Sequence, residues 1–183
     1  MRFIVRTTGD RDISALKEAI PDLIATTEGD NAMEGFICAL DLAEGDSCVH
    51  MEDDVILADG FVEKVRDVVE RYPNDVIQFF SMRKDDLTTG TRWIPGRKFC
   101  MGQCFYLPAG MSKSIRAYYD AGWRRISEHP TGLDLMVADY LGDNRIRYLN
   151  IVPNLVDHQQ VKSLIDPRRS TKRQSYTFRR NRE

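Results

Sequence analysis

Hydrophobic residues recur along the chain with two different periods. Short apolar runs bounded by turn residues predict strands, and apolar residues spaced three and four positions apart predict helices. Proline and glycine end several of these segments. The predicted strands are residues 2–6, 23–25, 47–51, 76–80, 105–107 and 147–152, and the predicted helices are residues 13–20, 31–43, 61–72, 111–121 and 133–141.

Strands and helices alternate through most of the chain, and this order is typical of α/β proteins. We therefore expect a single Rossmann-like α/β domain, with a mostly parallel sheet covered by helices on both faces. The domain is expected to span residues 1–165, and a basic tail is expected over residues 166–183.

The composition agrees with a globular protein of one domain. The chain has 183 residues, of which 42% are hydrophobic and 30% are charged, and this length is enough to bury a core. No apolar run approaches the length of a membrane span, and the first residues do not resemble a signal peptide. A cytoplasmic location is expected, in the host cytoplasm if the protein is viral.

The charge is distributed unevenly. The tail carries seven basic and two acidic side chains, whereas the other 165 residues carry 19 basic and 26 acidic ones. A basic tail with Tyr176 and Phe178 among its arginines suits nucleic acid, an anionic membrane surface or a lipid-linked glycan, or it serves only solubility. With little apolar periodicity, this tail is expected to stay without fixed structure until a partner binds.

Three consecutive acids, Glu52, Asp53 and Asp54, follow the predicted strand 47–51. Ligands of α/β proteins collect at the carboxyl ends of strands, and carboxylates there can hold Mg²⁺ or Mn²⁺. Because side chains alternate along an extended chain, Glu52 and Asp54 are expected to point one way and Asp53 the other. The alternative interpretation is a solvated acidic turn, or a cap for the helix that begins near Gly60.

Four stretches of the sequence, in order, resemble nucleotide-sugar glycosyltransferases of the GT-A fold, in particular the lipooligosaccharide and collagen galactosyltransferase type. They are HMEDDVILADGFVEKV at 50–65, FCMGQCFYLP at 99–108, HPTGLDLMVADYL at 129–141 and VPNLVDHQQVKSLID at 152–166. The resemblance covers roughly residues 1–165. The resemblance implies a GT-A-like domain and a divalent-metal-dependent transferase.

The resemblance also implies roles for individual residues. Glu52, Asp54 and His158 match the metal ligands, and a neutral imidazole is a competent ligand for Mn²⁺. Asp134 matches the catalytic acid of the family and would take the proton of an acceptor hydroxyl in an inverting reaction. Gly102 matches the glycine of the loop that precedes the acceptor site.

The loop after the first strand is where such a fold meets the base and ribose of its nucleotide. The loop around Asp30 is expected to form a second side of the nucleotide-binding site, and Lys162 is a candidate partner for a phosphate. The chain has neither a G-x-G-x-x-G motif nor a P-loop. The expected donor-binding residues are Arg6, Thr7, Thr8, Asp30, Asp53, Gly102 and Lys162.

The resemblance therefore implies a glycosyltransferase with Mn²⁺ or Mg²⁺ as cofactor and a nucleotide-diphosphate sugar, most simply a UDP-sugar, as donor. The acceptor is an anionic molecule with a hydroxyl group, such as a hydroxymethylated base in phage DNA, bound through the tail, or a glycan. Two alternatives remain. One is a metal-dependent nucleotidyltransferase or phosphohydrolase, since these enzymes also use clustered carboxylates. The other is a non-enzymatic nucleic-acid-binding module.

Overall fold

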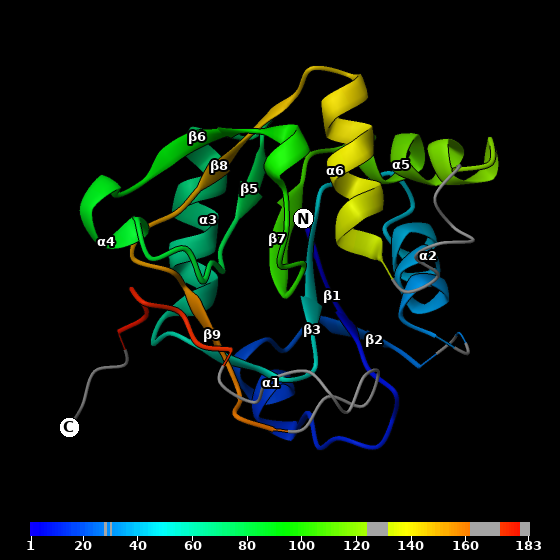
Figure 1. The fold of residues 1–183 in the computed structure, drawn as a ribbon. Coiled ribbons are helices and arrows are strands. Elements are labelled where there is room, and N and C mark those ends of the chain that lie inside the picture. The colour runs from blue at the N-terminus through cyan, green and yellow to red at the C-terminus, as the bar shows by residue number, and fades with distance from the viewer. Residues whose placement is uncertain (28, 30, 124–131, 162–172, 180–183) are drawn as a thin grey trace.

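A seven-stranded sheet with the order β2-β1-β3-β7-β5-β8-β6 forms the centre of the computed structural model (Figure 1). The structure describes residues 1–27, 29, 31–123, 132–161 and 173–179. The sheet consists of β1 (Arg2–Arg6), β2 (Leu23–Thr26), β3 (Cys48–Glu52), β5 (Val76–Gln78), β6 (Arg92–Pro95), β7 (Cys104–Leu107) and β8 (Arg147–Asn150).

A second sheet has two strands, β4 (Val55–Leu57) and β9 (Val156–His158). The helices are α1 (Ser14–Ala19), α2 (Ala32–Leu42), α3 (Phe61–Arg71), α4 (Asp86–Thr89), α5 (Met111–Asp120), α6 (Leu133–Asp143) and the short 3₁₀ helix Gly96–Lys98.

The central sheet is mostly parallel, as the sequence predicts. Strands β2, β1, β3, β5 and β8 run in one direction, and only β7 and β6 run in the other. The carboxyl ends of β1 and β3 lie side by side because Arg6 pairs with Glu52. These ends point toward the lower edge of the molecule in Figure 1, where α1 and β9 also lie.

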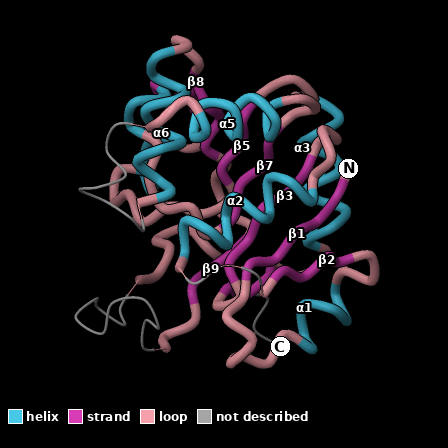
Figure 2. Tube along the Cα trace, turned by 90° about the vertical axis from the view of Figure 1, so that its right-hand side faces the viewer, coloured by secondary structure: helices cyan, strands magenta, loops and turns pink. Residues whose placement is uncertain are grey.

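Helices cover both faces of the sheet, so the predicted α/β fold is confirmed. One core packs α2, α5 and α6 against the sheet and includes Phe36, Phe105 and Met136. The other core packs α1 and α3 against the opposite face and includes Leu16 and Phe61. Figure 2 shows the two groups of helices on either side of the strands.

The structure differs from the sequence-based assignment in its shortest elements. The segment 83–93 was expected to be a loop, but it contains α4 and the beginning of β6. Helix α4 is a single turn whose Leu87 is 59% exposed, so it gives no apolar period. Strand β6 lies at the sheet edge and ends at Pro95, and strands β4 and β9 have three residues each. Such segments are too short for periodicity to identify.

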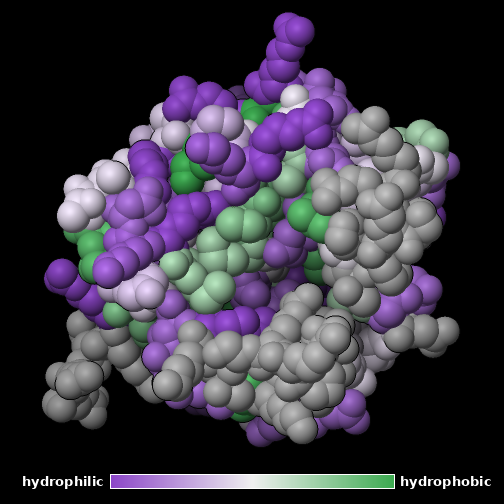
Figure 3. All heavy atoms as spheres, viewed as in Figure 1, coloured by the Kyte–Doolittle hydropathy of each residue, from purple (hydrophilic) through white to green (hydrophobic). Residues whose placement is uncertain are grey.

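The surface is mixed in polarity. In the space-filling view, a band of apolar groups crosses the middle of the visible face and polar side chains flank it (Figure 3). Within the described part of the chain, no helix has the length and apolar character needed to cross a membrane.

His50 is part of the core rather than of a surface site. It lies in β3 with no solvent exposure, and its ring stacks on Phe105 with centroids 5.4 Å apart and meets the edge of Phe36. Burial, together with the charge of Arg6, lowers the pKa of His50 to about 3. The folded protein therefore keeps this imidazole neutral at pH values where the unfolded chain protonates it.

This difference predicts a loss of stability in acid. The folded pKa of His50 lies below the unfolded value of about 6.5, so its contribution is complete above pH 6.5 and falls as the pH drops toward 3. Between pH 7 and pH 5, the wild type should lose about 2 kcal/mol more unfolding free energy than His50→Gln. Urea denaturation of both proteins at the two pH values measures this difference. Equal losses of unfolding free energy in the two proteins would contradict a lowered pKa of His50 in the folded state.

Candidate metal centre

The acidic triplet is enclosed by the protein. Asp53 and Asp54 are only 6% and 4% exposed, so the alternative of a solvated turn is wrong. The triplet does not cap the next helix either. Strand β4 lies between the triplet and α3, and the N-cap residue of α3 is Gly60, with no side-chain capping hydrogen bond. Buried carboxylates need compensating positive charge or hydrogen bonds.

Pairing of β4 with β9 brings His158 to the triplet. The two strands are antiparallel, with Val55 opposite His158, and the Gln159 amide donates a 2.7 Å hydrogen bond to the carbonyl oxygen of Asp54. The imidazole Nε2 of His158 consequently lies 3.1 Å from Asp54 Oδ2. His158 has no solvent exposure.

Glu52, Asp54 and His158 each offer one ligand atom, and these three atoms lie within 4.8 Å of one another. The structure thus brings together the three residues that the sequence analysis named as metal ligands. Their donor set of two carboxylates and one imidazole suits Mn²⁺ well and Mg²⁺ acceptably.

The buried polar atoms also fit a cation. Asp54 Oδ1 and His158 Nε2 are buried and have no well-aligned hydrogen-bond partner among the described residues. The other ring nitrogen of His158, Nδ1, contacts the carbonyl oxygen of Gln159. A carbonyl can only accept, so Nδ1 carries a proton and donates it to Gln159, and Nε2 is the ring nitrogen that faces Asp54. Metal-binding histidines commonly have this arrangement.

Arginines provide the positive charge around the triplet. Arg6 is 8% exposed, donates to the carbonyl oxygen of Gly102 at 2.8 Å and lies 3.5 Å from Glu52 Oε1. Arg11 Nη1 lies 2.6 Å from Asp53 Oδ1 and 2.8 Å from Asp54 Oδ2. The cluster is therefore a network of ion pairs in addition to a set of possible metal ligands.

The two ligand carboxylates differ in their proton affinity. Burial disfavours the charge of Asp54, but His158, Arg11 and Arg173 outweigh it and lower the pKa of Asp54. Burial, together with the charges of Asp54 and Asp134, raises the pKa of Glu52 to about 7 against the opposing effects of Arg6 and His158. Added positive charge at this point would stabilise the ionised form of Glu52.

Asp134 lies at the start of α6 and holds the loop that contains Gly102. Its Oδ2 accepts a 2.7 Å hydrogen bond from the Met101 amide. Helix α6 has Gly132 at its N-cap position and no side-chain capping bond, so Asp134 is not its cap. Asp134 also raises the pKa of Glu52, which shows that this carboxylate lies within electrostatic range of the triplet.

Of the other residues predicted to bind the donor, the structure describes some and leaves two undescribed. Thr7 and Thr8 lie in the loop after β1, where their hydroxyls accept hydrogen bonds from the amides of Gly9 and Asp10 at 3.0 and 3.4 Å. Arg6 and Asp53 belong to the ion-pair network rather than to an open nucleotide surface. The predictions for Asp30 and Lys162 fall outside the described residues.

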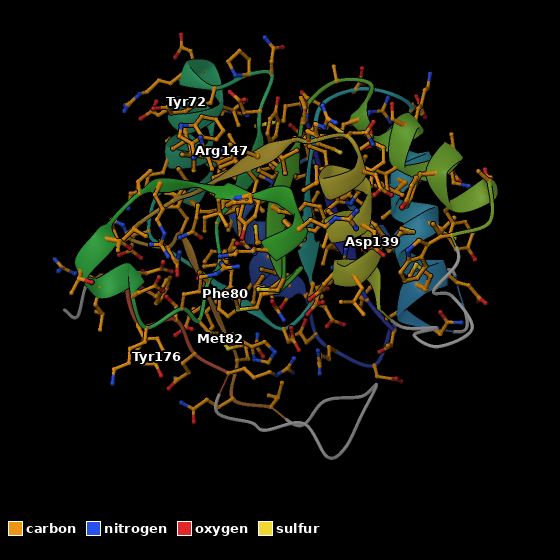
Figure 4. The ribbon with its side chains drawn as sticks, turned by 45° about the horizontal axis from the view of Figure 1, so that its top comes forward. Tyr72, Phe80, Met82, Asp139, Arg147 and Tyr176 are labelled. Atoms are coloured by element: carbon orange, nitrogen blue, oxygen red, sulfur yellow. The ribbon has the colours of Figure 1, made fainter. Side chains whose placement is uncertain are left out.

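Asp139 is the nearest other acid on α6, and it has a different function. It is 6% exposed, accepts a 3.0 Å hydrogen bond from the Trp123 indole and lies 3.1 Å from Arg97 Nη1. Figure 4 shows its position on α6. These contacts give Asp139 a structural role in anchoring α6.

Two residues of the site were missed from the sequence. Arg11 lies in the predicted nucleotide loop. Its position between Asp10 and Asp12 indicates an arginine that forms ion pairs with carboxylates. Arg173 belongs to the basic tail, and its Nη2 lies 4.0 Å from Asp54 Oδ2. No local pattern distinguishes Arg173 from the other arginines of the tail.

No protein-family model matches the chain, and no curated protein matches it. Among solved structures, the crystal structure of A197 from STIV is similar to this chain, with a TM-score of 0.52 and 14% sequence identity. The match covers 100% of this chain and 98% of that chain. At this identity the likeness supports the α/β fold over the whole chain and carries no information on activity.

Replacing Asp54 by Asn tests the metal centre. The amide has nearly the same shape but lacks the charge, so Asp54→Asn should weaken Mn²⁺ binding by at least about 10-fold. Titration with MnCl₂ followed by electron paramagnetic resonance measures the free ion directly. Asp59→Asn is the matched control, because Asp59 is an exposed acid just beyond β4. Equal Mn²⁺ affinity in Asp54→Asn and the wild type would exclude the triplet as a metal site.

Replacing Gly102 by Ala tests the packing around Asp134. A Cβ at Gly102 would lie 2.7 Å from Leu133 Cδ1 and 3.0 Å from Asp134 Oδ1, so the loop or α6 must shift. The substitution should lower the unfolding free energy by about 1–3 kcal/mol. Chemical denaturation measures the change, and unchanged stability would show that the loop has space that the structure does not contain.

Proposed function

We propose that the protein is a divalent-metal-dependent glycosyltransferase that uses a nucleotide-diphosphate sugar as donor. The observation that carries this proposal is the meeting of Glu52, Asp54 and His158 at the carboxyl edge of the sheet. Their order along the chain is the one that the resemblance to GT-A glycosyltransferases implies. Asp134, in the first turn of α6, accepts a hydrogen bond from the Met101 amide and lies within electrostatic range of Glu52.

Each group has a definite role in the proposed reaction. A cation held by Glu52, Asp54 and His158 would supply positive charge to the diphosphate that leaves. Asp134 takes the proton from the acceptor hydroxyl while the acceptor oxygen bonds to the anomeric carbon and the bond to the nucleoside diphosphate breaks. Attack from the side opposite the leaving group inverts the anomeric centre.

The acceptor is proposed to be an anionic molecule with a free hydroxyl, such as a hydroxymethylated base in DNA or a charged glycan. The described part of the basic tail, residues 173–179, lies next to the candidate metal centre. Tyr176 in this segment is 54% exposed (Figure 4), and Arg179 is also exposed. These two side chains are available for stacking and for phosphate contacts.

Product analysis separates this function from the alternative metal-dependent enzymes. Incubation with UDP-sugars and Mn²⁺ should release a nucleoside diphosphate and transfer the sugar, or release the free sugar slowly when no acceptor is present. A nucleotidyltransferase would instead transfer the nucleoside monophosphate and release sugar 1-phosphate, and a phosphohydrolase would cleave the diphosphate bond to give a nucleoside monophosphate and sugar 1-phosphate. Formation of sugar 1-phosphate as the main product would contradict the proposal.

Asp134→Asn tests the base. An Asn carbonyl oxygen can still accept the hydrogen bond from Met101, so the fold and donor binding should be retained. Because the amide cannot take a proton, kcat for sugar transfer should fall by about 10²- to 10⁴-fold. The KM for the donor should change little. A wild-type kcat in Asp134→Asn would remove Asp134 from the chemistry.

A further inference from the structure

The C-terminal segment of residues 173–179 is fixed against the strand that carries His158. The Ser175 amide donates a 2.7 Å hydrogen bond to Asp157 Oδ1, and the Ser175 hydroxyl donates to Asn154 Oδ1 at 2.6 Å. The Asn154 amide donates to the Thr177 hydroxyl at 3.1 Å. The expectation that the tail stays without fixed structure is thus wrong for this segment, which Figure 1 shows in red beside β9.

Asp157 and Asn154 connect this segment to the candidate metal centre. Asp157 Oδ1 accepts hydrogen bonds from both the His158 amide, at 2.9 Å, and the Ser175 amide. Asn154 is 2% exposed and also accepts a 3.1 Å hydrogen bond from the Ser81 amide just beyond β5. The segment is therefore tied to both sheets, and it holds Arg173 at a defined position near Asp54.

Two guanidinium groups converge on Asp54 from opposite ends of the chain. Arg11 Nη1 lies 2.8 Å and Arg173 Nη2 lies 4.0 Å from the same oxygen, Asp54 Oδ2. The imidazole of His158 is 3.1 Å from this oxygen as well, whereas Asp54 Oδ1 has no hydrogen-bond partner among the described residues. The side chains of Arg11 and Arg173 are 17% and 14% exposed, so each retains an edge toward solvent.

Arg11 already bridges Asp53 and Asp54, and Arg173 approaches the same oxygen of Asp54 at a longer distance. Arg173 Nε is buried and has no hydrogen-bond partner in the described ranges. A guanidinium has five N–H donors in a planar fork, and this geometry matches phosphate oxygens as well as carboxylates. If Asp54 serves a cation instead, Arg11 keeps its contact with Asp53 while Arg173 loses the carboxylate that it approaches, and a bound anion could then contact both guanidinium groups.

We propose that Arg11 and Arg173, which both approach Asp54 at the candidate cation site, form a clamp for the diphosphate of the ligand. This inference rests on the proposed function, because it assigns the diphosphate of the donor to these two residues. It also gives the C-terminal segment a role in donor binding, in addition to any role in holding an acceptor.

Binding measurements on the full chain test the clamp without a sugar donor. The ligand is inorganic pyrophosphate, titrated calorimetrically with and without Mn²⁺, and Mn²⁺ alone is titrated separately. In Arg11→Gln and Arg173→Gln, Mn²⁺ alone should bind as tightly as in the wild type or more tightly. The affinity for pyrophosphate in the presence of Mn²⁺ should fall by about 10- to 100-fold, as expected for loss of a charge-assisted hydrogen bond.

Matched variants separate the clamp from a general effect of charge or of folding. Arg71→Gln removes an exposed arginine at the end of α3 and should bind pyrophosphate like the wild type. Arg173→Lys keeps the charge without the planar fork and should bind with intermediate affinity. Thermal unfolding of each variant shows whether it is folded at the temperature of the titration.

Three results would overturn the clamp. They are wild-type affinity for pyrophosphate in both Gln variants, an equal loss of Mn²⁺ and pyrophosphate binding, or no pyrophosphate binding by the wild type. The proposed function fails separately, if pyrophosphate binds through the two arginines but no nucleotide-diphosphate sugar is consumed. The two failures are therefore distinguishable.

Discussion

The antiparallel pairing of β4 with β9 is the constraint on which the candidate site depends. This pairing places Val55 opposite His158 and joins the Gln159 amide to the carbonyl oxygen of Asp54. Two segments about a hundred residues apart in the sequence thereby bring their polar side chains together. A shift by one residue would turn His158 to the opposite face of its strand and separate it from Asp54.

Charge balance explains why so many basic residues surround this pairing. Three adjacent carboxylates in a mostly buried place are unstable without compensation. Arg6 is fixed beside Glu52, Arg11 bridges Asp53 and Asp54, and Arg173 approaches from the far end of the chain. Arg6 also donates a hydrogen bond to the carbonyl oxygen of Gly102, and the amide of the preceding residue, Met101, donates one to Asp134. One network therefore connects the proposed cation ligands with the proposed base.

The sequence predicts the larger elements for physical reasons, and the three proposed metal ligands through the resemblance. The helix over 31–43 has an apolar face with Phe36 and Leu40, and the packing of that face against the sheet follows from its period. The ligand set came from the resemblance, because the triplet alone also suited a solvated turn. Periodicity does not encode strand direction, so the reversed β7 was not predicted. The contacts of Arg11 and Arg173 depend on tertiary structure, which no local pattern contains.

A crystal structure of the protein with Mn²⁺ and a nucleoside diphosphate is the most direct test of the central claim. Anomalous scattering locates Mn²⁺ independently of any assumption about its ligands. The account predicts a single strong peak within bonding distance of Glu52, Asp54 and His158, with the diphosphate on its open side. A peak elsewhere, or a bound diphosphate with Arg11 still paired to Asp53 and Asp54 and no metal between the three ligands, would contradict it.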